Sequence, residues 1–481
     1  MYRIARKPSY VPTIMLAVTL FTIGLGLTGC QPQPEPVNGA AGIGDTYYAQ
    51  LGNGGYDVQN YTLALDVDPT SNMISATETI EANATGRLRS FNLDFQGLTV
   101  DTVEVNHVPA TFSHQDHELT ITPREPLASD RPFSVDITYH GYPEPLESAT
   151  SFRWIGWNVG WYHNTNGSIL VMSEPDGAAS WYPVNNHPRD KATYRFEIRV
   201  PKPWVAIASG TLREARDEGA LTRYVWEMNK PLASYLASIS IDKYVLEAAR
   251  TPAGVVIRNY FAPDTPDGIK KSISMIPDMI EYFSGVFGPY PFDEYGVVVP
   301  DANTPICYIP VAEEIQTLSI HCPDMLGEGR IAHELAHQWF GDSVSLKNWQ
   351  DIWLKEGMAT YAEWLWFTRR NMDVKVMNRV VRLKKASYAP TMKTGQPNPD
   401  NLYGEEVYTG GALVFHALRL KVGDEAFFKI LRTYLERYRY GNAGTDEFIA
   451  VAEEVSGQNL KADFNAWLLE NKLPDIPEPS K

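Results

Sequence analysis

A change of hydrophobic period near residue 250 divides this 481-residue sequence into two halves that must fold differently. Before it, apolar and polar residues alternate. "YTLALDVD" from Tyr61 and "FSVDITYHG" from Phe133 each place every second side chain on one apolar face. Similar runs, separated by Asn, Gly, Pro and Asp, recur to about Leu246. They predict a large antiparallel β-sheet domain, which we expect over residues 51–250.

The second half has the period of helices. In "DGIKKSISMIPDMIEYFSGVFG" the apolar residues stand at helical spacing, Pro277 predicts a kink, and Gly288 followed by Pro289 predicts the end. Further helices are predicted at 326–340, 350–370, 408–421, 424–437 and 445–455. We therefore expect a mainly helical domain over residues 251–475.

Composition narrows the function classes. Apolar residues make up 44% and charged residues 21%, as in globular proteins with a real core. The net charge is −16, and the body of the chain has no block of basic residues. These charges argue against a nucleic-acid partner and against electrostatic docking on anionic lipid.

The N-terminus has the composition of a leader. Arg3, Arg6 and Lys7 precede an apolar run from about Ile14 to Leu27. The run is shorter than the ~20 residues that a spanning helix needs, which favours a signal peptide over residues 1–29 rather than a transmembrane anchor. It ends in "LTGC", which resembles the bacterial lipobox, whose cysteine becomes the lipidated first residue. The resemblance implies lipidation at Cys30.

The residues after Cys30 predict where the protein resides. "QPQPEPVNGAAGIG" is rich in Pro and Gly, and residues 30–50 are predicted to be a flexible tether. A lipid on Cys30 would make the membrane a partner of the chain in the bacterial cell envelope. Gln31, in place of the Asp that retains lipoproteins at the inner membrane, favours the outer membrane.

Two further cysteines, Cys307 and Cys322, enclose "YIPVAEEIQTLSIH". Exported thiols can pair, so a disulfide is one interpretation. Two buried, unpaired cysteines are the other.

The stretch "IAHELAHQWFGD", which begins at Ile331, contains two histidines four residues apart. On a helix, His333 and His337 lie one turn apart on the same face and can bind one metal ion. Glu334 points elsewhere, which suits a general base beside a metal-bound water. The alternative is an amphipathic helix with two surface histidines. A hydrolytic zinc site needs a third protein ligand from another element.

"DIWLKEGMATYAEWLW" supplies that ligand. Glu356 follows His337 after eighteen residues. Gly341 and Asp342 can end the first helix, so that a second, antiparallel helix brings Glu356 to the same point. Glu356 stands among apolar residues, where an unpaired carboxylate is costly. The pattern therefore predicts one Zn²⁺ per chain, held by His333, His337 and Glu356.

These motifs resemble the gluzincin zinc aminopeptidases, the group of aminopeptidase N and leukotriene hydrolase. The similarity extends to "FGPYPFDEYGVVVPD", "HQWFGDSVSLKNWQDIWLKEGMATY", "VYTGGALVFHALR", "FIAVAEEVSGQNLKADFNAWL" and "SEPDGAASWYPVNNHPRDKATYRFEIRVP". It covers roughly Tyr56 to Pro474. It implies a multidomain α+β fold, with a saddle-like antiparallel β-sheet domain before a thermolysin-like, mainly helical zinc metallopeptidase domain.

The resemblance also implies roles. Glu334 would take a proton from the zinc-bound water and pass it to the leaving amine. Tyr408, before "TGGA", matches the family tyrosine that stabilises the oxyanion. The family holds the substrate's α-ammonium with a Gly-x-Met-Glu-Asn loop, where this chain has "PVAEEIQTLSI". Alignment places Glu314 at the anchoring position, with its neighbour Glu313 as the alternative.

Glu174 in "MSEPDG" matches the second amine anchor, whereas Met172 replaces a common glutamine. The sequence ends at Lys481, soon after the catalytic domain. Many members of the family carry a further helical domain that covers the active site, so the resemblance implies a more open site in this chain. We expect a zinc aminopeptidase that acts on peptides with a free N-terminus. The alternatives are a broader zinc metallopeptidase with endopeptidase activity and a non-catalytic, peptide-binding envelope lipoprotein.

Overall fold

The computed structural model describes residues 1, 35–148, 158–308, 311–369, 374–388, 392–470 and 472–477. The chain divides into two units, Met1–Glu35 and Pro36–Lys481. Apart from Met1, the predicted signal peptide lies outside the described residues, and so do Cys30 and Gln31. Among the helices that are described, none is long and apolar enough to cross a membrane.

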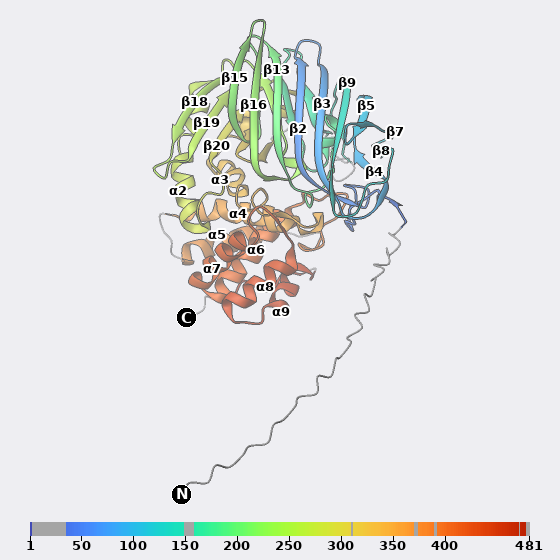
Figure 1. Ribbon diagram of the computed structural model, residues 1–481. Coiled ribbons are helices and arrows are strands. Elements are labelled where there is room, and N and C mark those ends of the chain that lie inside the picture. Colours follow the sequence, from blue (N-terminus) through green and yellow to red (C-terminus); the bar gives the residue numbers. More distant parts are fainter. Residues whose placement is uncertain are drawn as a thin grey trace. The chain divides into compact units, whose positions relative to one another are not determined.

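An eight-stranded sheet dominates the first part of the second unit (Figure 1). Its strand order is β15-β16-β13-β2-β3-β9-β5-β6. Alternate residues of its strands are buried, as the period-two pattern predicted. The strands are β2 Tyr56–Asp68, β3 Met73–Ala84, β5 Thr99–Val105, β6 Val108–Pro109, β9 Arg131–Gly141, β13 Ala192–Pro201, β15 Thr211–Glu218 and β16 Leu221–Leu232.

One pair in this sheet departs from the predicted antiparallel arrangement. β2 and β13 run parallel, with Asn60 beside Thr193. The rings of Tyr61 and Tyr194 stack across the pair, 4.8 Å between centroids. Alternation specifies which face of a strand is buried but not the direction of its neighbour, so the pattern was compatible with either arrangement.

Two smaller sheets complete the sheet domain. Their strand orders are β1-β4-β8-β7 and β10-β11-β12-β17-β14. The strand β12 leads directly to Glu174, so the second of them positions a predicted amine anchor. The strands are β1 Val37–Asn38, β4 Leu88–Asp94, β7 Thr111–Gln115, β8 Glu118–Thr122, β10 Leu146–Glu147, β11 Asn158–His163, β12 Ile169–Met172, β14 Val205–Ala208 and β17 Ile239–Asp242.

The predicted tether over residues 30–50 is wrong from Val37 onward. β1 pairs with β4, and Asp45 is buried. The Asp45 carboxylate contacts His187 Nε2 at 3.1 Å and accepts a hydrogen bond from the Trp349 amide at 2.9 Å. Tyr48 donates a hydrogen bond to the Pro399 carbonyl. Polar partners on both halves therefore hold a segment that composition alone marked as unstructured.

A second five-stranded sheet, of order β18-β19-β20-β22-β21, precedes the helices. The antiparallel hairpin β18–β19 spans the predicted domain boundary at residue 250, so this sheet begins earlier, at Val245. The Cys307–Cys322 disulfide encloses the edge strand β21, which carries Glu313 and Glu314. The strands are β18 Val245–Arg250, β19 Val256–Phe261, β20 Glu294–Val299, β21 Ala312–Ile315 and β22 Leu318–His321.

The helices follow the predicted order with three differences. The first predicted helix is two, because Pro277 lies in the first turn of α2 rather than at a kink. α6 begins three residues before Tyr408, and the prediction missed α5 and α9. The helices are α1 Asp267–Ser272, α2 Ile276–Phe287, α3 Glu328–His337, α4 Trp353–Thr368, α5 Val374–Ser387, α6 Glu405–Val422, α7 Asp424–Arg437, α8 Thr445–Ser456 and α9 Lys461–Leu468; the short strands β23 Ser345–Leu346 and β24 Asn442–Ala443 pair beside them.

α4 and α6 cross at two glycines. A Cβ atom added to Gly357 would lie 2.6 Å from the Gly411 Cα, and one added to Gly411 would lie 2.7 Å from the Gly357 Cα. The backbones therefore touch without intervening side chains. Glu356 precedes the first glycine, and Tyr408 lies one turn before the second, so this crossing brings both to one place.

Candidate active site

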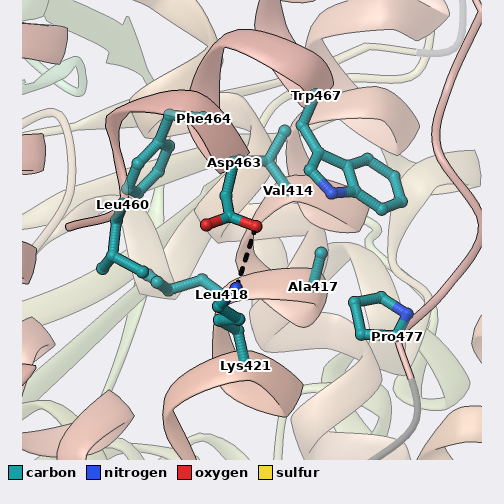
Figure 2. A pocket seen from close by; sticks show the side chains of 9 residues that line it. All are labelled: Val414, Ala417, Leu418, Lys421, Leu460, Asp463, Phe464, Trp467 and Pro477. Atoms are coloured by element: carbon teal, nitrogen blue, oxygen red, sulfur yellow. Dashed lines mark hydrogen bonds and ion pairs between the residues drawn. The ribbon is translucent and has the colours of Figure 1, made fainter. Parts of the chain in front are cut away.

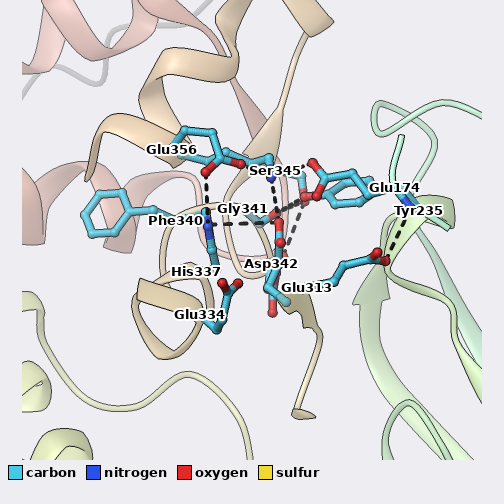
Figure 3. Close-up of polar contacts among 12 residues, drawn as sticks. Glu174, Tyr235, Glu313, Glu334, His337, Phe340, Gly341, Asp342, Ser345 and Glu356 are labelled. Atoms are coloured by element: carbon cyan, nitrogen blue, oxygen red, sulfur yellow. Dashed lines mark hydrogen bonds and ion pairs between the residues drawn. The ribbon is translucent and has the colours of Figure 1, made fainter. Parts of the chain in front are cut away.

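Three predicted metal ligands converge between α3 and α4. His333 and His337 lie one turn apart on α3, and each directs its Nε2 toward Glu356 on α4. The distances to Glu356 Oε2 are 3.2 Å from His333 and 3.5 Å from His337. Gly341, with a φ of 126°, lets the chain leave α3 and turn toward α4. Figure 3 shows His337 and Glu356 directed toward each other, with Glu334 alongside.

The outer nitrogens of both histidines are also held. His333 Nδ1 lies 2.8 Å from Glu363 Oε1, and His337 Nδ1 lies 3.0 Å from the Phe340 carbonyl. Such partners orient ligating histidines and fix their tautomers. The sequence prediction missed Glu363, although it stands seven residues after Glu356, two turns along the same helix face.

The charges around the cluster suit a cation. Burial alone would raise the pKa of Glu356, but Lys355 and the two histidines hold it well below its usual range, so the carboxylate is ionised. Burial alone would lower the pKa of His333, yet its hydrogen bonds to Glu356 and Glu363 raise it to about 10. The surrounding carboxylates therefore stabilise positive charge at this ring, and they would stabilise a bound metal ion in the same way.

The donor set fits Zn²⁺. One ligand atom from each of His333, His337 and Glu356 lies within 4.8 Å of the others, and all three side chains are buried. Two imidazoles and one carboxylate form one of the donor sets of catalytic zinc, with a fourth position for water or substrate.

Glu334 lies beside this centre and does not complete it. Its side chain is buried, and Arg330 approaches it at 3.8 Å. Burial raises its pKa against the opposing effect of His333, Arg330 and His337. A carboxylate with a raised pKa is a better proton acceptor and donor near neutral pH.

Tyr408 lies close to one of the predicted ligands. Its ring is 5.9 Å from that of His333, centroid to centroid. Burial, and then the charge of Glu356, raise the pKa of Tyr408 well above its usual value, so the hydroxyl keeps its proton. A protonated phenol can donate a hydrogen bond to a developing oxyanion.

Glu313 and Glu314 point in opposite directions because they are neighbours on β21. Glu314 faces the metal cluster, with Oε1 3.9 Å from His337 Nδ1. Glu313 faces the sheet domain and accepts hydrogen bonds from the amides of Ser173 and Glu174 at 3.0 and 3.3 Å. Glu314 is therefore the one placed to meet a substrate, and Glu313 holds the loop that carries Glu174.

Two sequence models of one family match the chain. The Peptidase M1 N-terminal domain matches residues 57–236, and the Peptidase family M1 domain matches residues 327–467. The second match contains the three predicted zinc ligands, Glu334 and Tyr408. The chain belongs to the M1 family of peptidases.

Named relatives and solved structures agree with the assignment. Aminopeptidase N of Streptomyces lividans is 30% identical over 58% of this chain and 35% of its own length. Aminopeptidase M1 of Arabidopsis thaliana is 24% identical over 87% of this chain and 50% of its own. This M1 chain thus spans about half the length, or less, of these relatives. The M1 zinc metallopeptidase of Deinococcus radiodurans is 28% identical, with a TM-score of 0.83, over 92% of this chain and 99% of its own.

The M1 site contains a residue whose role the sequence prediction did not consider. This residue is Lys355 of "WLKEG", whose Nζ lies 2.5 Å from Glu174, 2.7 Å from Glu314 and 2.6 Å from Glu356. The sequence feature that could have revealed its role is its position directly before a predicted metal ligand, in an otherwise apolar helix turn.

A small hollow of this M1 chain lies between α6 and α9 (Figure 2). Its volume is about 30 Å³, roughly the space of one water molecule. Its lining is mainly apolar, and its acid, Asp463, is paired with Lys421 at 3.2 Å. It is too small for a peptide.

Proposed function

We propose that this chain is a zinc-dependent aminopeptidase that removes N-terminal residues from peptides. The observation that carries the proposal is the arrangement of two sets of groups side by side. His333, His337 and Glu356 form a metal site with Glu334 beside it, and the carboxylates of Glu174 and Glu314 lie next to that site. The names of the relatives support it, as does a structure of the Deinococcus radiodurans M1 enzyme bound to a Tyr-Ser-Ala substrate.

Each residue of the site would have a separate role in hydrolysis of the peptide bond. Bound zinc would supply a water of lowered pKa and polarise the scissile carbonyl. Glu334 would accept the proton of the attacking water and deliver it to the leaving amine. The Tyr408 hydroxyl would donate a hydrogen bond to the carbonyl oxygen as negative charge develops there. Glu174 and Glu314 would hold the α-ammonium, which sets the position of the first peptide bond.

The second candidate is a zinc metallopeptidase with endopeptidase activity. The contact of Lys355 with both amine anchors favours it, because those carboxylates already have a cationic partner. A non-catalytic binder is less well supported, since Glu334 beside the ligands has no evident use in binding alone. The discriminating experiment incubates the chain from Gln31 onward with free and N-acetylated peptides, with and without a chelator.

Glu314→Gln tests amine recognition. The change removes one charge that faces the α-ammonium, and breaking a buried charge pair costs about 3 kcal/mol or more. We expect kcat/KM for free-amine peptides to fall about 100-fold, with a much smaller fall for N-acetylated peptides. Steady-state kinetics on both substrate types measure the difference.

The matched control for that experiment is Glu425→Gln, an exposed position on α7. It should leave both substrates unaffected. Equal losses on free and blocked peptides in Glu314→Gln would show that Glu314 does not recognise the amine. Glu313→Gln is unsuitable as a control, because Glu313 holds the backbone of Glu174.

We further propose that the chain is a lipoprotein of the bacterial cell envelope, anchored at Cys30 and directed to the outer membrane by Gln31. The Cys307–Cys322 disulfide supports an oxidising compartment. Cys30→Ser should move the protein from the membrane fraction to the soluble fraction, because the acylated cysteine would be its anchor. Fractionation and gel mobility of the two forms test this, and an unchanged membrane association would contradict it.

A further inference from the structure

Lys355 is surrounded by carboxylates. Its side chain is 1% exposed, and its Nζ contacts one oxygen each of Glu174, Glu314 and Glu356 at 2.5 to 2.7 Å. The ring of Tyr235 covers the remaining side, 5.6 Å from Nζ to the centroid. A lysine ammonium has three N–H donors, so the three carboxylates use all of them.

The three carboxylates come from different parts of the fold. Glu174 follows β12 in the sheet domain, Glu314 lies on the edge strand β21, and Glu356 lies beside Lys355 on α4. One ligand oxygen of each lies within 4.8 Å of the others. Figure 3 shows Glu174 and Glu356 entering this region from separate elements. The arrangement therefore brings Glu174 and Glu314 to a point where Lys355 already provides a cation.

A lysine ammonium and a peptide's α-ammonium are the same chemical group. We propose that Lys355 acts as a built-in competitor at the amine-binding carboxylates Glu174 and Glu314, and so weakens the enzyme's preference for peptides with a free N-terminus. The inference rests on the proposed aminopeptidase function. Lys355 is then a specificity-determining residue that touches the same oxygens as the substrate.

The physical reason is the cost of unpaired buried charge. Without Lys355, a bound peptide with a blocked N-terminus leaves Glu174 and Glu314 facing each other without a cation, and only a free α-ammonium relieves this. With Lys355 present, both carboxylates keep a partner whichever peptide binds. A free amine then gains less, because it shares oxygens that are already in use.

The experiment compares Tyr-Ser-Ala with N-acetyl-Tyr-Ser-Ala in wild type and in Lys355→Met, which keeps an unbranched side chain but loses the charge. Binding is measured by calorimetry on zinc-loaded protein that also carries Glu334→Gln, so that turnover does not interfere. KM and kcat are measured with Glu334 intact. We expect Lys355→Met to bind the free peptide at least about tenfold more tightly, with little change for the acetylated peptide. Lys355→Arg should keep the wild-type ratio.

The opposite result is equally clear. If Lys355→Met folds and binds zinc but its ratio of free to acetylated affinity is unchanged or lower, Lys355 is a structural ion pair and the proposal is wrong. Lys355→Gln repeats the test if the methionine variant does not fold. If both fail to fold while Lys355→Arg folds, a structural role is again the answer. Absence of cleavage of either peptide by wild type would instead contradict the aminopeptidase function, whereas the binding ratios would still decide the role of Lys355.

Discussion

Glu334→Gln is expected to reduce kcat by a factor of about 10² to 10⁴, the usual contribution of a general acid–base group, while the zinc stays bound. Glutamine fills nearly the same volume but cannot accept the water's proton. Glu334 is not among the three ligands that converge on the metal position, so its replacement removes no donor. Steady-state rates measure the loss, and elemental analysis measures the retained zinc.

Glu328→Gln is the matched control for that variant. Glu328 lies on the same helix, in its first turn, where it contacts Arg369 and the Trp366 indole rather than the metal cluster. We expect near wild-type rates from it. Activity of Glu334→Gln within a few-fold of wild type would remove Glu334 from the mechanism.

His337→Ala is expected to eliminate zinc binding and, with it, essentially all hydrolysis. Only two of the three predicted ligands remain in this variant. In addition, Glu356 loses one of the groups that lower its pKa, and the Phe340 carbonyl loses its contact with His337. Wild type should bind about one Zn²⁺ per chain, and chelation should reproduce the loss of activity. Zinc at 100 times its Kd also stabilises the folded state by about 2.7 kcal/mol, so the melting temperature of wild type should rise with added zinc.

The control for the metal experiment is His107→Ala, because the His107 side chain is 81% exposed and lies in the sheet domain. It should keep its zinc, its activity and the zinc-dependent rise in melting temperature. A His337→Ala protein that still contains about one zinc per chain would show that the metal site is elsewhere.

Local spacing made the metal site predictable. His333 and His337 must share a helix face if the segment is helical, and Glu356 has an evident reason to be buried only if it binds a cation. The alternation from Tyr61 predicted the buried face of the large sheet for a similar reason. In each case the information is contained in short stretches of the sequence.

Several of the features that sequence reasoning missed depend on residues far apart in the chain. The parallel pairing of β2 with β13 joins Asn60 to Thr193, and the packing of residues 37–50 depends on partners such as Trp349. Neither is implied by the residues nearby. Lys355 was overlooked for a similar reason, since its meaning comes from Glu174 and Glu314, which other elements supply.

The glycine contact between α4 and α6 has a consequence for how such an enzyme can evolve. The helices that carry Glu356 and Tyr408 touch through the backbone of Gly357 and Gly411. No side chain at this crossing can therefore be exchanged to adjust the distance between the metal site and the Tyr408 hydroxyl. Glu174, by contrast, lies in the loop after β12, outside the α4–α6 crossing. New substrate preferences should therefore arise by variation of the sheet-domain loop, while the pair Gly357 and Gly411 keeps the chemistry constant.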